Sequence, residues 1–335
     1  AVLCVSAIAC SGASPAAPTT PATAAPSAPA APQPPTCRIV NSPGVTALDS
    51  DVACLSISGS NETLDCQGHT INAAIDATGI ASGVSILNCT MKGVNLPWNV
   101  TNMTIANSTI NGAIAIAFGH NNAIRQDRFV GGVTGGALVT FAGGDHNQIS
   151  DSSLDGNYHG QCSVCGFDDA ILLWNESDDT VQGNAISNVW DAGIEGVDAV
   201  VDSTITSNTI DNALSAGIAS YWCTHWQGNT IADNHVSDAT TLVRFSYRTG
   251  PLCFGFGSAP SGLFSANTVA GNTLRDPTGF EVVLMSLDFQ TNPAAADSNE
   301  LQDNDVGSGG VLAQPAAAFI NAGGNTCGTS GNFRC

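Results

Sequence analysis

Positive charge is scarce in this chain. Only 8 of its 335 residues are Lys or Arg, against 28 Asp or Glu, and the formal net charge is −20. So acidic a surface disfavours nucleic acid, anionic membranes and polyanionic substrates as partners. Clustered carboxylates could bind Ca²⁺, and no other metal or cofactor is indicated.

Long apolar runs and helical periodicity are missing as well. No segment reaches the ~20 apolar residues of a transmembrane helix, so we expect no membrane span. Apolar residues do not recur at the 3.6-residue period of an amphipathic helix, and Gly, Asn, Asp and Ser stand between them. This spacing predicts an all-β protein of short strands and turns.

The dominant feature that is present is a six-residue unit with an aliphatic residue, a short polar turn and a second large apolar residue. Successive copies begin 19 to 38 residues apart. A unit this short cannot bury its own apolar face, so the copies must stack and share a core. They are Ile86–Met91, Ile105–Ile110, Ile124–Phe129, Ile149–Leu154, Val181–Ile186, Ile205–Ile210, Ile231–Val236, Val269–Leu274 and Leu301–Val306.

A second set of apolar segments lies between the units. Each coil should therefore add two or three strands to parallel sheets, and roughly ten coils at ~4.8 Å would extend about 50 Å. The segments are Ala113–Phe118, Ala137–Phe141, Ala170–Trp174, Ala192–Gly196, Ala216–Ser220, Leu242–Ser246, Phe280–Met285 and Ala317–Asn321.

The fourth residue of the unit predicts a hydrogen-bonded ladder. In the last five copies it is Asn, an amide that tolerates turn conformations and can bond to its equivalent one coil away. The nine residues are Cys89, Ser108, Asp127, Ser152, Asn184, Asn208, Asn234, Asn272 and Asn304.

The stretch Leu64–Ile71 (LDCQGHTI), followed by Ile86–Met91 and the later units, resembles right-handed parallel β-helix proteins of the pectate-lyase-like superfamily. The resemblance covers about residues 52–325. It implies a single-domain right-handed solenoid. Because the superfamily includes polysaccharide lyases, hydrolases and epimerases together with proteins that have no chemistry, the fold alone does not decide the activity.

The first residues of the chain indicate export. Residues 1–10 are apolar and look like the tail of a secretory signal, and Ala7–Cys10 resembles a lipoprotein cleavage box, so Cys10 could carry a lipid anchor. Ordinary signal cleavage nearby is the alternative. Residues 11–36, rich in Ala and Pro, predict a disordered spacer, and residues 37–335 form the β-helix domain. We expect a secreted or cell-surface protein.

Ten of the twelve cysteines follow the spacer, an even number that fits an oxidising compartment. Cys66 and Cys89 hold nearly equivalent positions on neighbouring coils, which predicts a bridge between them. The other local pairs are Cys37–Cys54, Cys223–Cys253 and Cys327–Cys335, the last of which would clamp the final coil. Cys162 and Cys165 stand near His159 at a metal-like spacing, but a disulfide is the favoured interpretation.

Six Asn-x-Ser/Thr triplets favour a eukaryotic source, in which they could carry glycans, whereas the lipoprotein box favours a bacterial one. Triplets of this kind also arise freely in an Asn- and Thr-rich β-helix. They begin at Asn61, Asn88, Asn99, Asn102, Asn107 and Asn175.

The candidate site is a cluster of aromatic and charged residues on the longest coils. Four of the five tryptophans fall within residues 174–226. If Ile171, Ile194, Ile218 and Val243 are equivalent, Asp168 and Asp191 stack roughly 5 Å apart, and Glu195 and Arg244 lie two coils or ~10 Å apart. The candidate substrate-binding residues are Trp174, Trp190, Tyr221, Trp222, His225, Arg244 and Arg248.

Paired carboxylates roughly 5–10 Å apart suit acid/base cleavage of a glycosidic bond. The sequence Gly166–Ile171 (GFDDAI) is similar to the paired-Asp strand of β-helical polygalacturonases, and that resemblance nominates Asp168 and Asp169. The candidate catalytic residues are Asp168, Asp169, Asp191 and Glu195. The Gly-His-Gly and Arg-x-Lys signatures of that family are absent, which weakens the hydrolase interpretation. A lyase needs a Lys or Arg base, and the only lysine, Lys92, is far from the cluster, so Arg244 and Arg248 are the remaining candidates.

Two functions stay open at this point. One is binding, and cleavage by carboxylates, of an extracellular polysaccharide. The other is a non-catalytic structural or adhesive role, in which the Asp residues make turns and the aromatic rings plug the interior. An open groove beside outward carboxylates would favour the first function, and buried rings would favour the second.

Overall fold

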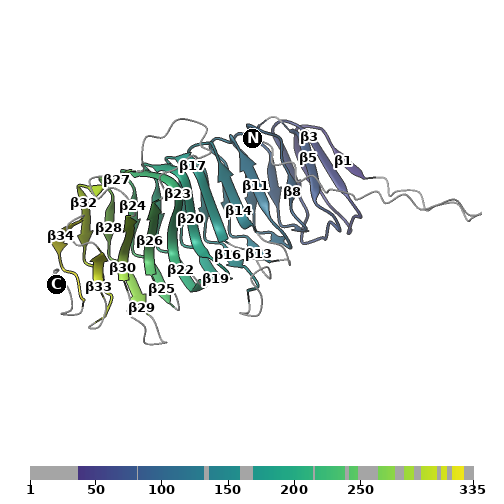
Figure 1. Ribbon diagram of the computed structural model, residues 1–335. Helices are drawn as coiled ribbons and strands as arrows, with labels where there is room; N and C mark the ends of the chain where they lie inside the picture. Colours follow the sequence, from purple (N-terminus) through teal and green to yellow (C-terminus); the bar gives the residue numbers. More distant parts are fainter. Residues whose placement is uncertain are drawn as a thin grey trace, which may run out of the picture. The chain divides into compact units, whose positions relative to one another are not determined.

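The computed structural model describes residues 37–80, 82–131, 136–158, 169–213, 216–237, 241–247, 263–275, 283–289, 296–307, 311–314 and 319–327. They belong to one compact unit, Thr36–Cys335. Within these ranges every regular element is a β-strand, and no helix could cross a membrane. Figure 1 shows the strands stacked coil upon coil from β1 to β34.

Three parallel sheets form the walls of the solenoid. The largest, here called the long-strand sheet, has 14 strands. Twelve of them follow one another in chain order, and β27 and β31 continue from β23. They are β1 (Arg38–Val40), β3 (Leu55–Gly59), β5 (Ile75–Ile80), β8 (Val94–Asn95), β11 (Ile114–Ala117), β14 (Ala137–Ala142), β17 (Asp169–Ser177), β20 (Ala192–Val201), β23 (Ala216–Gln227), β26 (Thr241–Tyr247), β30 (Val283–Phe289), β33 (Val311–Gln314), β27 (Leu263–Ser265) and β31 (Ala296–Asp297).

The other two walls carry the two halves of the six-residue unit. A 12-stranded sheet holds its first half: β2 (Gly44–Ala47), β4 (Glu62–Asp65), β6 (Ser85–Leu87), β9 (Thr104–Ala106), β12 (Ala123–Arg125), β15 (Gln148–Ser150), β18 (Thr180–Gln182), β21 (Thr204–Thr206), β24 (Thr230–Ala232), β28 (Thr268–Ala270), β32 (Asn299–Gln302) and β34 (Phe319–Gly323). An 8-stranded sheet holds its second half: β7 (Thr90–Met91), β10 (Thr109–Ile110), β13 (Arg128–Val130), β16 (Ser153–Asp155), β19 (Ala185–Val189), β22 (Thr209–Ala213), β25 (His235–Ser237) and β29 (Thr273–Arg275).

The repeat unit predicted the register of these sheets. Ile105 pairs with Ile86 on one side and with Ile124 on the other, and all three are fully buried. Strand alternation sends each of these side chains inward and its neighbours outward. The same column continues to Leu301, so the core is a stack of aliphatic residues along the solenoid axis.

One strand was assigned to the wrong wall. We expected Ala317–Asn321 to continue the long-strand sheet, but β33 occupies that place and β34 pairs with β32 of the 12-stranded sheet. The pairing of β34 with β32 explains the difference, because Phe319 aligns with Asn299 and its ring lies near that of Phe264. Phe319 therefore belongs to the 12-stranded sheet.

Two predicted disulfides are present. Cys37 bonds to Cys54 with a Cα–Cα distance of 4.7 Å, and Cys66 bonds to Cys89 at 4.9 Å. Both join neighbouring coils. Cys327 is also disulfide-bonded. Cys162, Cys165, Cys253 and Cys335 lie outside the described residues, and of Cys223 only the backbone is described.

The predicted amide ladder runs through the interior of the turn. Asn208 donates from Nδ2 to Asn234 Oδ1 at 3.0 Å, and its Oδ1 accepts from Asn184 Nδ2 at 3.0 Å. The same bond continues through Asn272 and Asn304 to Asn325. These side chains are almost completely buried, so their bonds replace water that they cannot reach.

A second ladder lies two residues before seven of the nine units, where sequence reasoning missed it. Asn122, Asn147, Asn229, Asn267 and Asn299 are buried there, with Asp179 and Ser203 in the same column. Asn229 Nδ2, for example, donates to Asn267 Oδ1 at 2.9 Å. The sequence does contain the pattern, because a polar residue stands two positions before the first aliphatic residue of seven successive units.

We predict that Asn208→Ala lowers the free energy of unfolding by about 3 kcal/mol, because it removes buried hydrogen bonds to Asn184, Asn234 and Val181. Chemical denaturation of both proteins measures the difference. Asn72→Ala, at an exposed position, is the matched control and should change stability by less than ~0.5 kcal/mol. Equal losses in the two variants would contradict the ladder's role.

Asp127 is an acidic residue in the first ladder, at a position where later coils have Asn. Its Oδ1 accepts the Ser108 N–H at 2.7 Å, but no described group bonds its buried Oδ2. Burial raises the pKa of Asp127 to about 7. The folded state therefore binds more protons than the unfolded chain between pH ~4 and 7, and stability falls as the pH rises through that window.

We predict that Asp127→Asn stabilises the protein by roughly 1–3 kcal/mol at pH 8, since an amide stays neutral and can donate from the Nδ2 position. The gain should be much smaller at pH 5, where Asp127 already holds its proton. Thermal melts at both pH values check this, with the exposed Asp49→Asn as control. A gain independent of pH would rule out the proposed cause.

Candidate functional site

The predicted site lies on the outer face of the long-strand sheet, where its strands are longest. β17, β20 and β23 have 9, 10 and 12 residues. Ile171 pairs with Ile194, Ile194 with Ile218, and Ile218 with Val243, as the sequence predicted. Glu195 is therefore two coils from Arg244 in the same column, through Ala219.

Three of the four candidate catalytic carboxyls lie on described residues, and the structure brings them together. Asp169 hydrogen-bonds the Glu195 side chain, and Asp191 lies close enough to act on the charge of Asp169. The backbone N–H of Ala192 donates to Asp169 Oδ1 at 3.1 Å. Asp168, the fourth candidate, lies outside the described residues.

This carboxyl pair is shielded from water. Asp169 is 5% exposed and Glu195 is 8% exposed. Burial, followed by the charge and the hydrogen bond of Glu195, raises the pKa of Asp169 well above its usual range. Of the two groups, Asp169 is therefore the one whose pKa is raised by its surroundings, and it hydrogen-bonds Glu195. The two groups are in contact, closer than the ~5 Å or more that separates the carboxyls of glycosidases.

The Trp174 indole N–H makes a hydrogen bond to a carboxyl on the next coil. Its half-buried indole donates from Nε1 to Asp198 Oδ2 at 2.6 Å, and Asp198 itself is 5% exposed. The bond joins β17 to β20 and gives the Asp198 carboxylate a donor. The polar edge of the Trp174 ring is therefore occupied by a contact within the protein.

The remaining candidates are placed less completely. Trp190 is half-buried, and His225 Nε2 contacts Gln227 Oε1 at 3.1 Å. Tyr221 and Trp222 lie on β23 and Arg244 on β26, with only their backbone described. Arg248 and His159 lie outside the described residues. Trp226, which we did not select, is fully buried and packs across Gly196.

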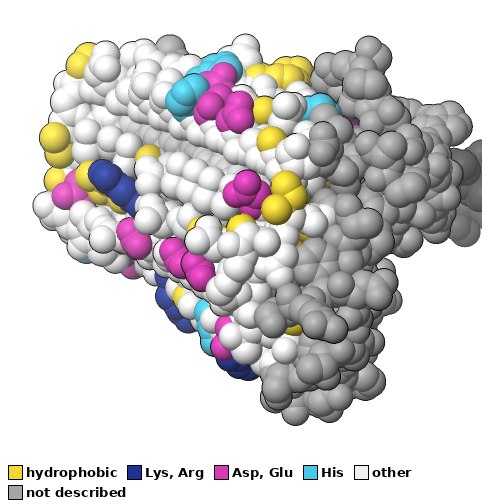
Figure 2. Space-filling model, turned by 90° about the vertical axis from the view of Figure 1, so that its left-hand side faces the viewer, with side chains coloured by type: hydrophobic (Ala, Val, Ile, Leu, Met, Phe, Trp, Pro, Cys, Tyr) yellow, Lys and Arg dark blue, Asp and Glu magenta, His cyan; other side chains and the backbone are white. Residues whose placement is uncertain are grey.

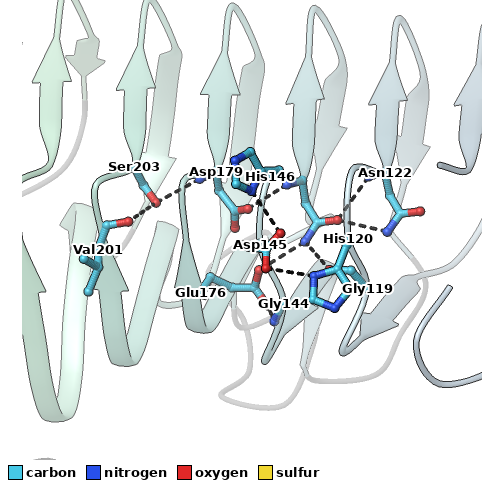
Figure 3. Close-up of polar contacts among 11 residues, drawn as sticks. Gly119, His120, Asn122, Gly144, Asp145, His146, Glu176, Asp179, Val201 and Ser203 are labelled. Atoms are coloured by element: carbon cyan, nitrogen blue, oxygen red, sulfur yellow. Dashed lines mark hydrogen bonds and ion pairs between the residues drawn. The ribbon is translucent and has the colours of Figure 1, made fainter. Parts of the chain in front are cut away.

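A second buried carboxyl pair, Glu176 and Asp179, escaped sequence analysis (Figure 3). Glu176 accepts the Gly144 N–H at 2.7 Å and the Asn147 Nδ2 at 3.2 Å. Asp179 occupies the second amide ladder, where it accepts the Asn147 N–H at 2.8 Å. Burial, with the charge of Glu176 next, raises the pKa of Asp179 to about 9. Asp179 is thus the protonated partner and donates to Glu176.

Beside this pair, Asp145 holds two histidines at the surface. His120 Nδ1 lies 2.8 Å from Asp145 Oδ2, and His146 Nδ1 lies 2.9 Å from Asp145 Oδ1. Hydrogen bonds from His146 and His120 keep the pKa of Asp145 below its usual range. Figure 2 likewise shows histidine and acidic side chains in contact on a face that carries few Lys or Arg.

A cation site is not formed by these groups. Across the described ranges, no three His, Cys, Asp or Glu side chains are arranged to hold a metal ion. The Ca²⁺ site that clustered carboxylates could make therefore stays a prediction from composition.

Comparison with known proteins establishes the family. The model of the right-handed β-helix region matches residues 82–274. No curated protein matches the chain. Solved structures with the same fold include the Dettilon tailspike protein, with 16% identity, a TM-score of 0.50, and 88% of this chain and 59% of that chain covered.

Two further structures have similar likeness. The tailspike protein of E. coli bacteriophage HK620, solved with a pentasaccharide, has 12% identity, a TM-score of 0.53 and coverage of 87% of this chain and 60% of its own. PfbA, a surface adhesin of Streptococcus pneumoniae, has 14% identity, a TM-score of 0.51 and coverage of 83% and 78%. The chain thus spans about three fifths of the tailspike chains, and the likeness concerns the fold.

We predict that Trp174→Phe costs about 1–3 kcal/mol of stability, because it leaves the buried Asp198 carboxylate without its indole donor. Denaturant unfolding measures the loss. In an Asp198→Asn background the same substitution should cost clearly less, as a double-mutant cycle would show. An identical loss in both backgrounds would mean that the ring's packing matters and its hydrogen bond does not.

Proposed function

This chain belongs to the right-handed β-helix family, and on that premise we propose that it is an exported protein that binds an extracellular polysaccharide along the outer face of β17, β20 and β23. The spacer of residues 11–36 would hold the β-helix domain away from a surface, with or without a lipid on Cys10. A net charge of −20 favours a neutral glycan over a polyanionic one.

The contact between Asp169 and Glu195 supports cleavage as the chemical step. The raised pKa of Asp169 and its hydrogen bond to Glu195 make Asp169 the candidate proton donor to a glycosidic oxygen. Because Glu195 touches Asp169, it cannot also stand across a sugar from it. Asp191 and Asp168 are therefore the candidates for the second carboxylate, which would activate water or attack the sugar directly.

The surrounding candidates would bind sugar rings and hydroxyls. Trp174 and Trp190 are half-buried and leave part of their rings accessible, and His225 is on the same sheet. Tyr221, Trp222, Arg244 and Arg248 complete the proposed surface.

A second function, a non-catalytic adhesive or structural role, is favoured by the shielding of the acid pair. Carboxyls exposed by only 5% and 8%, in direct contact, resemble a cohesive internal pair more than an open catalytic site. Two buried ladders and parallel sheets would suit a durable surface component.

The deciding experiment has two stages. A glycan array identifies the polysaccharides bound, and a reducing-end assay on these tests cleavage. We predict that Asp169→Asn lowers cleavage at least 100-fold and leaves binding within about twofold, because a general acid commonly contributes 10²–10⁴-fold. Activity should fall as the pH rises and Asp169 loses its proton, because its pKa is raised above the usual range.

Asp49→Asn, an exposed substitution remote in sequence from the candidate site, is the matched control and should keep both activities. Binding without cleavage by the wild-type protein would select the adhesive function. Absence of binding to every glycan would remove the proposal altogether.

A further inference from the structure

One corner of the solenoid carries a residue that its backbone disfavours. Asn99, Phe118, Gly143 and Asn175 occupy equivalent positions, linked by backbone bonds from Asn99 to Ala117, from Phe118 to Ala142 and from Gly143 to Trp174. All four have positive φ, at 64°, 52°, 77° and 55°. Asn and Gly tolerate this conformation, whereas a bulky aromatic residue there is strained.

The strained Phe118 builds a pair of rings on the outer surface. Its ring lies 5.5 Å from that of Trp98, centroid to centroid, at an interplanar angle of 42°. Across the corner it covers Gly143, where an added Cβ would come within 2.8 Å of the Phe118 ring. Trp98 is 68% exposed. Strain of this kind persists where the placed side chain serves a function.

Polar groups lie two positions further along the same corner. Thr101, His120 and Asp145 form a parallel row of bridges, and His120 follows Phe118 by two residues. Asp145 binds the Nδ1 atoms of both His120 and His146 (Figure 3), and the three side chains are 36% to 59% exposed. With their Nδ1 atoms held, the two imidazoles can use Nε2, and the carboxylate its remaining lone pairs, as donors and acceptors toward a ligand.

We propose that Trp98 and Phe118, with His120, Asp145 and His146 beside them, form a binding site for a neutral pyranose unit of an extended glycan. An aromatic face packs against the C–H face of a sugar ring, and the imidazole and carboxylate groups match its hydroxyls. The ligand class is that of the proposed function, but the residues are different, so either site can fail without the other.

The size of the apolar surface favours a sugar over a second protein chain. Among the described residues, four large hydrophobic side chains are exposed: Ile39, Val45, Trp98 and Ile320. The other three lie on β1, β2 and β34. A ring pair flanked by polar groups suits one sugar unit, whereas stable protein interfaces bury roughly 1,200–2,000 Å² in total.

The test is native affinity electrophoresis of the full chain through gels containing neutral soluble polysaccharides, namely a mixed-linkage β-glucan, a mannan, a galactan or a starch-type α-glucan. We expect at least one to retard the protein, and both Trp98→Ala and Phe118→Asn to weaken that retardation at least tenfold. Phe118→Asn installs the residue found on neighbouring coils, so its unfolding temperature should equal or exceed that of the wild type.

Ile39→Ala, which removes another exposed hydrophobic side chain, is the control and should bind as the wild type does. Unchanged retardation of Trp98→Ala would overturn the site, as would a wild type that no gel retards.

If Phe118→Asn does not fold, Trp98→Ala alone decides. If Trp98→Ala instead only abolishes self-association in sedimentation, the rings contact a second copy and the proposal is wrong. Loss of binding in Trp174→Ala but not Trp98→Ala would support the proposed function and reject this site.

Discussion

The in-register stacking of buried side chains is the constraint on which the rest of this structure depends. Each short strand has too little apolar surface to be stable alone, and it gains a core only from the coils above and below. The two amide ladders add to the specificity of this register, because side chains such as Asn208 donate to one neighbouring coil and accept from the other. A coil that slipped by one residue would turn its buried amides and its aliphatic side chains to the opposite face, so the ladders and the aliphatic packing both oppose slippage.

Burial also explains why acids in this protein meet as pairs that favour a shared proton. Asp169 lies one coil before Glu195, and Glu176 lies three residues before Asp179 on the same coil. In each pair the two carboxyls meet where little water reaches them. Burial and the neighbouring charge therefore raise the pKa of Asp169 and of Asp179. The Glu176–Asp179 pair is integrated into an amide ladder, whereas the Asp169–Glu195 pair lies on the outer face of the strands that lengthen most.

The outer surface follows different rules from the core. Corner positions with positive φ are occupied mainly by Asn, Asp and Gly, which tolerate this conformation. Phe118 is an exception, because a bulky aromatic residue is strained there. The chain has few cations, so its surface offers little to anionic partners, and the part that the structure describes exposes few large apolar side chains. Its sites are accordingly local arrangements of one or two rings with hydrogen-bonding groups, distributed over different coils.

The repeat of aliphatic residues was enough to determine the fold class, the register of Ile171 with Ile194, the first amide ladder and two disulfides, because stacking repeats the same local chemistry in every coil. Local pattern did not determine that Asp169 contacts Glu195, that Trp174 bonds Asp198, or that Phe118 meets Trp98. These contacts depend on side-chain direction and on how much water the coils exclude, and they join residues 20 to 26 positions apart. Only the packed tertiary structure decided them, since burial and proximity across coils are properties of the stack and of no single segment.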